Sequence, residues 1–282
     1  MNLTLAQWLT PWEFSPTLLI CFALSAYLFI KGSIARPIST LRHVLFWSGW
    51  VMLYLAMHTH VDYFAERVFF IHRAQHVFLH HLAPLLVMAA YPGQVMRAGM
   101  PMSVRIGLKK FRATTIGRLL EEVCTNKYFV PFMFVFLVLV WLIPTVQFYS
   151  MLDVHLYRLM NWSVVVSGFL YWNLILDRRP APPAAMSPTG RVISPILTMA
   201  PQIAAGIYIA LAPTDLYPLF DLCGRAVPIS ALEDQGYGGV IMWVPAAAVE
   251  SFGIIVALMT WMRLSAKGRL TSPRAIKLSF NT

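Results

Sequence analysis

Charged residues are scarce in this sequence of 282 residues. Asp, Glu, Lys and Arg together make up 12% of it, whereas hydrophobic residues make up 58%, and the mean hydropathy is +0.64. A water-soluble globule cannot bury so large an apolar fraction. The three cysteines are too few for a disulfide scaffold, and an aromatic content of 13% excludes a disordered chain. The composition therefore indicates an integral membrane protein.

Short motifs that carry common enzyme chemistry are also absent. The sequence contains no Walker loop, no G-x-G-x-x-G, no G-x-S-x-G and no H-E-x-x-H. Nucleotide binding, acyl transfer and zinc-dependent proteolysis therefore have no support from motifs. We expect no enzymatic activity.

Seven hydrophobic segments are present, each about long enough for a helix that crosses roughly 30 Å of hydrocarbon. The expected spans are residues 15–31, 42–58, 68–91, 128–148, 155–176, 192–212 and 238–262. We therefore predict an all-α integral membrane protein in which residues 1–282 form a single domain of seven transmembrane helices. The longest connections are an inner basic loop at 92–127 and an outer loop at 213–237.

The basic residues predict the orientation of these helices. Of the 22 Lys and Arg residues, 18 follow the first, third, fifth and seventh spans. The positive-inside rule makes that side cytoplasmic, which places the N-terminus outside and the C-terminus in the cytoplasm. The net charge of +10 is spread over four segments without a nucleic-acid-binding motif. We therefore expect this positive charge to be balanced by anionic lipids, and we expect no nucleic-acid partner.

The histidines are concentrated in the predicted outer half of the protein and near its midplane. His72, His76 and His80 are four residues apart on the third span, so they fan over about 80° of the helix surface, while His81 points the other way. Two histidines one turn apart, such as His72 and His76, can bind one metal ion. Pro84 cannot donate a hydrogen bond to the His80 carbonyl, so we expect a kink and a free carbonyl there.

Residues at the outer boundary could complete a metal site around His72 and His76. The second span ends with Met57, His58 and His60, and His155 opens the fifth span. Imidazoles with thioethers nearby and few thiolates suit copper, although imidazole alone also suits zinc or haem iron. The predicted cofactor is copper, and the candidate ligands are His72, His76, His58, His60, His80 and Met57.

A structural role is the alternative for each of these side chains. A histidine can form an interhelical hydrogen bond, and a methionine can fill space between helices. Glu250 lies in the middle of the seventh span and needs a partner. It either contacts His80 or His81, in a proton relay or otherwise, or it is a neutral carboxyl group bonded to a neighbouring helix.

Two stretches resemble the CtaG family of seven-span assembly factors for caa-type cytochrome c oxidases. Residues 72–76 (HRAQH), followed by 82–86 (LAPLL), are similar to its H-x-x-Q-H…A-P-P-L-L run, with Leu85 in place of the second proline. Residues 230–245 (SALEDQGYGGVIMWVP) closely match its s-x-L-x-D-Q-x-x-G-G-x-I-M-W-V-P segment. The chain departs from the family at Asn161, where a histidine is frequent, which weakens the inference of a ligand from the fifth span.

The resemblance implies a role in maturing a copper-containing respiratory oxidase. The partner would be an oxidase subunit, and the location the inner (plasma) membrane of a bacterium. By this similarity His72 and His76 would be the ligands. Asp234, Gln235, Met242 and Trp243 would line or support the site, and Met242 joins the candidate metal ligands.

Two other function classes remain open. A membrane b-type cytochrome would need two histidines facing each other across haem, such as His76 or His80 with His155. A metal permease would need a continuous polar path, for which the inner half offers few groups beyond Glu250 and Asp177.

Overall fold

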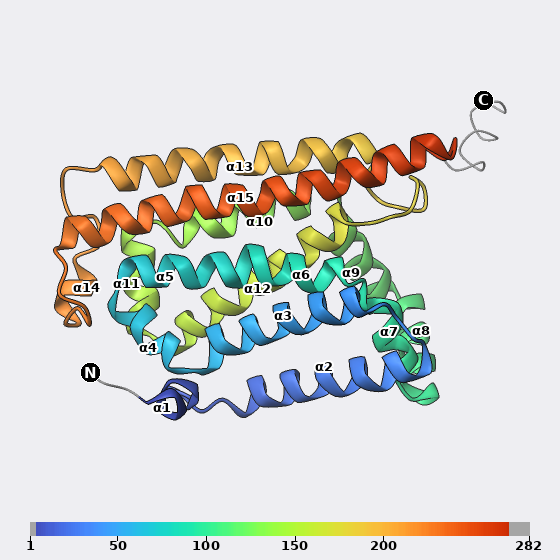
Figure 1. The fold of residues 1–282 in the computed structure, drawn as a ribbon, viewed down its shortest axis with the longest axis horizontal. Coiled ribbons are helices and arrows are strands. Elements are labelled where there is room, and N and C mark those ends of the chain that lie inside the picture. The colour runs from blue at the N-terminus through green and yellow to red at the C-terminus, as the bar shows by residue number, and fades with distance from the viewer. Residues whose placement is uncertain (1–3, 271–282) are drawn as a thin grey trace.

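The computed structural model describes residues 4–270, which contain helices and no β-strand (Figure 1). The all-α prediction is therefore confirmed for this part of the chain. The helices are α1 (Leu5–Leu9), α2 (Pro16–Ala35), α3 (Thr40–His58), α4 (His60–Arg67), α5 (Phe69–His76), the π-helix η1 (Val77–Leu82), α6 (Ala83–Ala89), α7 (Pro92–Gly99), α8 (Met102–Ala113), α9 (Thr115–Thr125), α10 (Phe129–Val140), α11 (Pro144–Leu152), α12 (Val154–Ile175), α13 (Pro188–Leu211), α14 (Leu219–Leu222) and α15 (Ala231–Ala266).

Each of the seven predicted spans coincides with a helix or a run of helices. By length and apolar composition, α2, α13 and α15 can each cross a membrane, and α9 with α10 forms a fourth candidate that is bent by 68°. The third predicted span consists of α5, η1 and α6, each short by itself. Within residues 4–270, α3, α12 and the run α5–η1–α6 are not among these candidates.

The long helices lie side by side with their axes roughly aligned (Figure 1). α13 packs along α15, α15 packs on α5, and α12 packs against η1 and α10. The short helices α1, α4, α11 and α14 lie at one end of the bundle, and α7, α8 and α9 lie at the other (Figure 1). The run α5–η1–α6 is therefore enclosed by the other long helices.

α15 begins earlier than the predicted span. Ser230 and Glu233 form a capping box, in which the backbone N–H of each residue donates to the side chain of the other. This cap starts the helix at Ala231, seven residues before position 238. The predicted outer loop at 213–237 therefore ends at Ser230, and it contains the short helix α14.

The kink expected next to His80 is replaced by a wider helix. Residues 77–82 form a π-helix, and the N–H of Ala83 donates to the carbonyl of Phe78, five residues earlier. Pro84 has no N–H group for the regular α-helical hydrogen bond, and the extra residue in the turn accommodates this missing bond. On α12, Gly168 lies against the His80 carbonyl oxygen, and a Cβ atom there would collide with it. Only glycine allows α12 to approach η1 this closely.

Candidate functional site

The histidine-bearing helix α5 is fixed at its start by a carboxylate from α15. The backbone N–H groups of Phe69 and Phe70 donate to the two carboxylate oxygens of Asp234, at 3.0 and 2.8 Å. Arg225 forms an ion pair with the same carboxylate. These N–H groups belong to the first turn of α5 and have no partner within the helix. Asp234 therefore sets the position of α5 relative to α15.

Gln75, between the two histidines of the HRAQH run, attaches α5 to its other neighbours. Its amide nitrogen donates to the carbonyl of Ala56 at 2.7 Å and to Asp62 Oδ1 at 2.7 Å. Tyr157 donates to the same Asp62 oxygen at 2.6 Å. Gln75 thus holds α5 against α3 and α4, which fixes the direction in which its histidines project.

Asp62 lies on α4, outside the helices that could cross a membrane. Burial raises its pKa from 3.8 to about 6, although the hydrogen bonds from Tyr157 and Gln75 act in the opposite direction. Burial also raises the pKa of Glu66 on the same helix to about 7, and the charge of Asp62 adds to this shift. Both carboxyl groups therefore gain or lose a proton near neutral pH.

His72 and His76 form a pair with unused ring nitrogens. Their ring centroids are 4.5 Å apart, and His72 is completely buried. Neither ring nitrogen of His72 has a hydrogen-bond partner, nor does Nε2 of His76. Buried imidazole nitrogens almost always have a partner, so these atoms suit a ligand bound between the two rings.

A small cavity lies beside this pair. Its volume is about 20 Å³, enough for one water molecule or ion. Its polar lining consists of Arg73, His76, His80, His81 and Gln202, and Met242 adds a thioether. The cavity thus joins His76 to the two histidines of η1, whereas His72 does not line it.

Arg73 is the unexpected member of this lining. Its guanidinium group is buried, and Nε and Nη2 have no hydrogen-bond partner. The group lies 5.3 Å from the centre of the Phe69 ring, and it forms no ion pair with a carboxylate within residues 4–270. A positive charge therefore lies next to His72 and His76.

His80 and His81 begin a chain of polar contacts across the bundle. Nε2 of His80 is 3.0 Å from the Ser167 hydroxyl, and its Nδ1 is 3.3 Å from Nε2 of His81. Nδ1 of His81 lies 3.5 Å from a carboxylate oxygen of Glu250. Of the two alternatives for Glu250, the contact with His81 is therefore present, and so are bonds to a neighbouring helix.

Glu250 continues this chain onto α13. Thr198 donates to one carboxylate oxygen at 2.9 Å and Gln202 to the other at 2.8 Å. The Thr198 hydroxyl is also 3.0 Å from the hydroxyl of Tyr171. Tyr171 and Ser167 are one turn apart on α12, so the chain of contacts begins and ends on the same helix. We call this set the polar belt: Ser167, His80, His81, Glu250, Thr198, Gln202 and Tyr171.

The remaining predicted ligands lie in different surroundings. The His58 ring packs against Phe14 and Tyr54, and the His60 ring packs against Trp12 and Tyr63. Met57 belongs to an apolar cluster and lines a groove described below. Over the described part of the chain, no three His, Cys, Asp or Glu side chains are grouped closely enough to hold a metal ion.

Of the residues implied by the resemblance, Asp234 and Met242 lie at the site itself. Gln235 instead anchors the outer loop, since it accepts from the N–H of Leu216 at 2.7 Å and donates to the carbonyls of Ile209 and Thr214. Trp243 packs on Gly206 of α13. These two residues support the end of the bundle near the site.

Several polar residues of the site were missed by sequence reasoning. Ser167, Thr198 and Gln202 contact His80 or Glu250. A detectable signal was present, because an amide side chain within an apolar helix such as α13 needs a partner. The spacing along the chain does not show which helix supplies that partner.

Comparison with protein families identifies the family of this chain. The family model described as cytochrome c oxidase caa3 assembly factor (Caa3_CtaG) matches residues 22–264. Neither a search of curated proteins nor a search of solved structures found a match. The matched region includes α5, η1 and the start of α15, which together build the site. The chain therefore belongs to the Caa3_CtaG family of cytochrome c oxidase caa3 assembly factors.

Proposed function

We propose that this protein supports insertion of copper into a respiratory oxidase by holding the ion at His72 and His76 and releasing it to an oxidase subunit. The observation that carries the proposal is the pair of adjacent imidazoles with unpartnered ring nitrogens. Nearby Met242 offers a thioether, a soft ligand that favours Cu(I). Two imidazoles and a thioether form an incomplete shell, which suits transfer of an ion better than permanent storage.

The site has no feature that requires turnover chemistry. The side chains around the cavity supply metal ligands and hydrogen bonds. We propose that the protein is an assembly factor without catalytic activity, in line with the function of its family.

Haem binding by a histidine pair is less well supported. His80 lies against Ser167, and His155 is twelve residues earlier on the same helix, roughly 18 Å away along its axis. These two imidazoles cannot ligate one iron atom. The cavity of about 20 Å³ is also far too small for a porphyrin.

A metal permease is also less well supported. The polar belt begins at Ser167 and ends at Tyr171, which are one turn apart on α12. It therefore runs across the bundle and not along it. Towards α7 and α9, an apolar cluster that includes Leu85, Val130 and Trp172 follows. A permeating ion would lose its polar contacts there.

We further propose that all seven predicted spans cross the plasma membrane of a bacterium, with α4 and α14 outside and α8 inside. The placement of the short helices at two opposite ends supports this topology (Figure 1). Gly107 on α8 has open space around it, so Gly107→Cys should not disturb the fold. In intact cells, an impermeant thiol reagent should label Cys223 and leave Gly107→Cys unlabelled. Labelling of Gly107→Cys without labelling of Cys223 would show the inverse orientation.

Complementation of a deletion strain tests the function in the cell. Under copper limitation, the strain should make the oxidase polypeptides, but the enzyme should be copper-poor and inactive. The wild-type gene and the control His155→Ala should restore activity, because His155 is exposed and outside the site. The variant His72→Ala/His76→Ala should not restore it. Full oxidase copper content in the deletion strain would overturn the proposal.

A further inference from the structure

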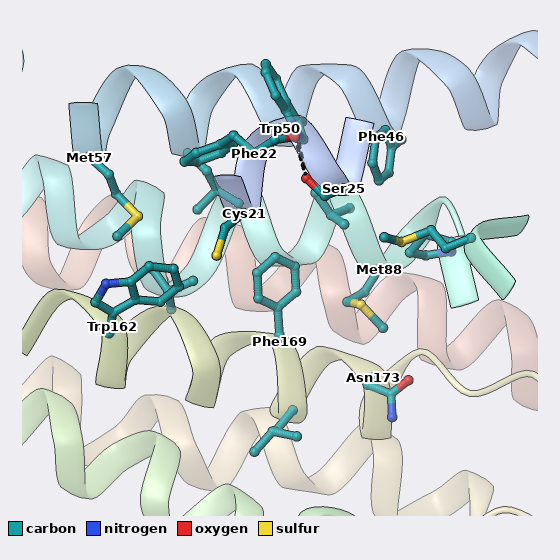
Figure 2. A pocket seen from close by; sticks show the side chains of 16 residues that line it. Cys21, Phe22, Ser25, Phe46, Trp50, Met57, Met88, Trp162, Phe169 and Asn173 are labelled. Carbon is teal, nitrogen blue, oxygen red and sulfur yellow. Dashed lines mark hydrogen bonds between the residues drawn. The ribbon is translucent and has the colours of Figure 1, made fainter. Parts of the chain in front are cut away.

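An apolar groove lies between α2, α3 and α12, away from the histidine site (Figure 2). Its volume is about 460 Å³. Met57 and Trp162 lie at one end, and Met88 and Asn173 lie towards the other (Figure 2). Except for Ser25 and Asn173, the side chains that line it are apolar or a thiol. A pocket of this composition suits a hydrocarbon ligand.

The backbone of α2 meets that of α7 closely at one end of the groove. Gly32 on α2 and Gly99 on α7 allow the two backbones to meet, and a Cβ atom at either position would collide with the facing helix. Further along α2, a hydrogen bond of 3.1 Å from Trp50 to Ser25 links it to α3 (Figure 2). Phe22 packs on Trp50, and Phe29 stacks on Phe46 of α3. The groove lies beside these contacts, on the side of α2 and α3 that faces α12.

The groove adjoins a basic pocket at the end of the bundle where α7 lies. This pocket has a volume of about 430 Å³ and contains Arg42, Arg178, Arg179 and Asp177. Three arginines and one aspartate leave it with a net charge of +2. Met88, Pro92 and Asn173 line both spaces, so the two are adjacent.

The arginines of the basic pocket are held in place by different contacts. Arg42 donates to the carbonyls of Ala90 and Tyr91 at 2.7 and 2.9 Å. Arg178 stacks on the Tyr91 ring at 3.8 Å, and Arg179 forms an ion pair with Asp177 at 2.7 Å. Arg42 and Arg178 form no ion pair within residues 4–270. Their charges are available to an anion.

The length of the groove fits the hydrocarbon part of a lipid. Phe46 and Met57 line it on α3 and are eleven residues apart, roughly 16 Å along the helix. Half of the hydrocarbon core of a bilayer is about 15 Å thick. The groove is thus about as long as an acyl chain that crosses one leaflet, and the basic pocket lies at the end where the headgroup would be.

We propose that the groove and the basic pocket together bind one anionic phospholipid. An acyl chain occupies the groove between α2, α3 and α12, and the phosphate contacts Arg178 and Arg42. The charge of the pocket selects an anionic headgroup over a zwitterionic one. This site is separate from His72 and His76, so the lipid binds whether or not copper does.

Native mass spectrometry of the purified protein tests the proposal with two added lipids. The probes are phosphatidylglycerol and phosphatidylcholine with the same acyl chains. Wild-type protein should retain phosphatidylglycerol preferentially. In Arg178→Gln/Arg179→Gln, retention of phosphatidylglycerol should fall roughly ten-fold, because two charges near the phosphate are lost. Both residues are exposed, so the variant should fold. The control Lys110→Gln/Lys127→Gln removes two exposed charges elsewhere and should bind as the wild type does.

A second variant tests the acyl chain separately. Cys21 is exposed in the wall of the groove, so Cys21→Trp should fill the space without changing the charge. It should lower retention of both lipids. The proposal is overturned if the arginine variant retains phosphatidylglycerol as the wild type does, if both lipids bind wild-type protein equally, or if Cys21→Trp has no effect.

Discussion

At the scale of single residues, Arg73 places a positive charge beside the two imidazoles that we propose as copper ligands. The charge is buried and has no carboxylate partner within residues 4–270. At an effective dielectric constant of about 20, a neighbouring unit charge opposes a bound cation by a few kcal/mol. Arg73 would therefore weaken the binding of copper and favour its release.

Arg73→Met tests this effect, since methionine fills much of the same space without the charge. The affinity for Cu(I) should rise by roughly ten- to hundred-fold, because the repulsion is removed. A competition titration against a chelator measures the change. Arg158→Met removes an exposed arginine at the same end of the bundle and should leave the affinity unchanged. Weaker binding by Arg73→Met would contradict this role.

Asp62 makes stability depend on pH. Its pKa is raised by burial from 3.8 to about 6, so between these values the folded protein binds a proton that the unfolded chain has lost. The contribution of Asp62 to the free energy of unfolding is complete below pH 4 and is lost as the pH rises through about 6. Its size is about 3 kcal/mol. Because the pKa of Glu66 is also raised, the loss of stability continues to about pH 7.

In detergent, the melting temperature should therefore fall between pH 4 and pH 7. Asp62→Asn should reduce this fall, because the amide does not ionise yet can still accept from Tyr157 and Gln75. Glu122→Gln changes an exposed carboxylate and serves as the control. An unchanged pH profile in Asp62→Asn would show that another group is responsible.

Within the histidine cluster, sequence spacing identified the pair and the structure added its surroundings. The i, i+4 positions of His72 and His76 follow from helix geometry alone, and their rings are indeed neighbours. The positions of His58 and His60 depend on how α3 and α4 pack. Aromatic residues from the first 63 positions surround these two rings. Spacing within one helix contains no information about such contacts.

At the scale of the elements, the junction between η1 and α12 determines where His80 lies. Gly168 permits the contact with the His80 carbonyl, and Ser167 next to it bonds to the His80 ring. The sequence indicated a break near Pro84, and the chain does depart from α-helical geometry there. The turn there is wider than in an α-helix, and α12 packs directly against it.

Gly168→Ala should destabilise the protein by about 1–3 kcal/mol, since the added methyl group forces η1 and α12 apart. Gly107→Ala is the matched control, because it makes the same substitution in an open position on a helix. It should be neutral or stabilising by up to about 1 kcal/mol. Thermal unfolding of both variants in one detergent gives the comparison. Equal melting temperatures would show that the close approach at Gly168 is not needed.

At the scale of the whole molecule, the hydrophobic pattern predicted the positions of the helices, and the charge pattern predicted which connections share an end of the bundle. The structure places α7, α8 and α9 together, opposite α4 and α14 (Figure 1). The polar belt and the lipid groove could not be predicted, because each joins residues from helices that are far apart in sequence. Their assembly depends on helix packing, which hydropathy does not determine.

The central claim is that His72 and His76 together hold copper, and the copper content of purified protein tests it most directly. Wild-type protein reconstituted with Cu(I) and then desalted should retain about one copper ion per chain, since two imidazoles on one helix can share a metal ion. The variant His72→Ala/His76→Ala should retain almost none, while His155→Ala should retain the wild-type amount. Equal copper content in the double variant and the wild type would contradict the account.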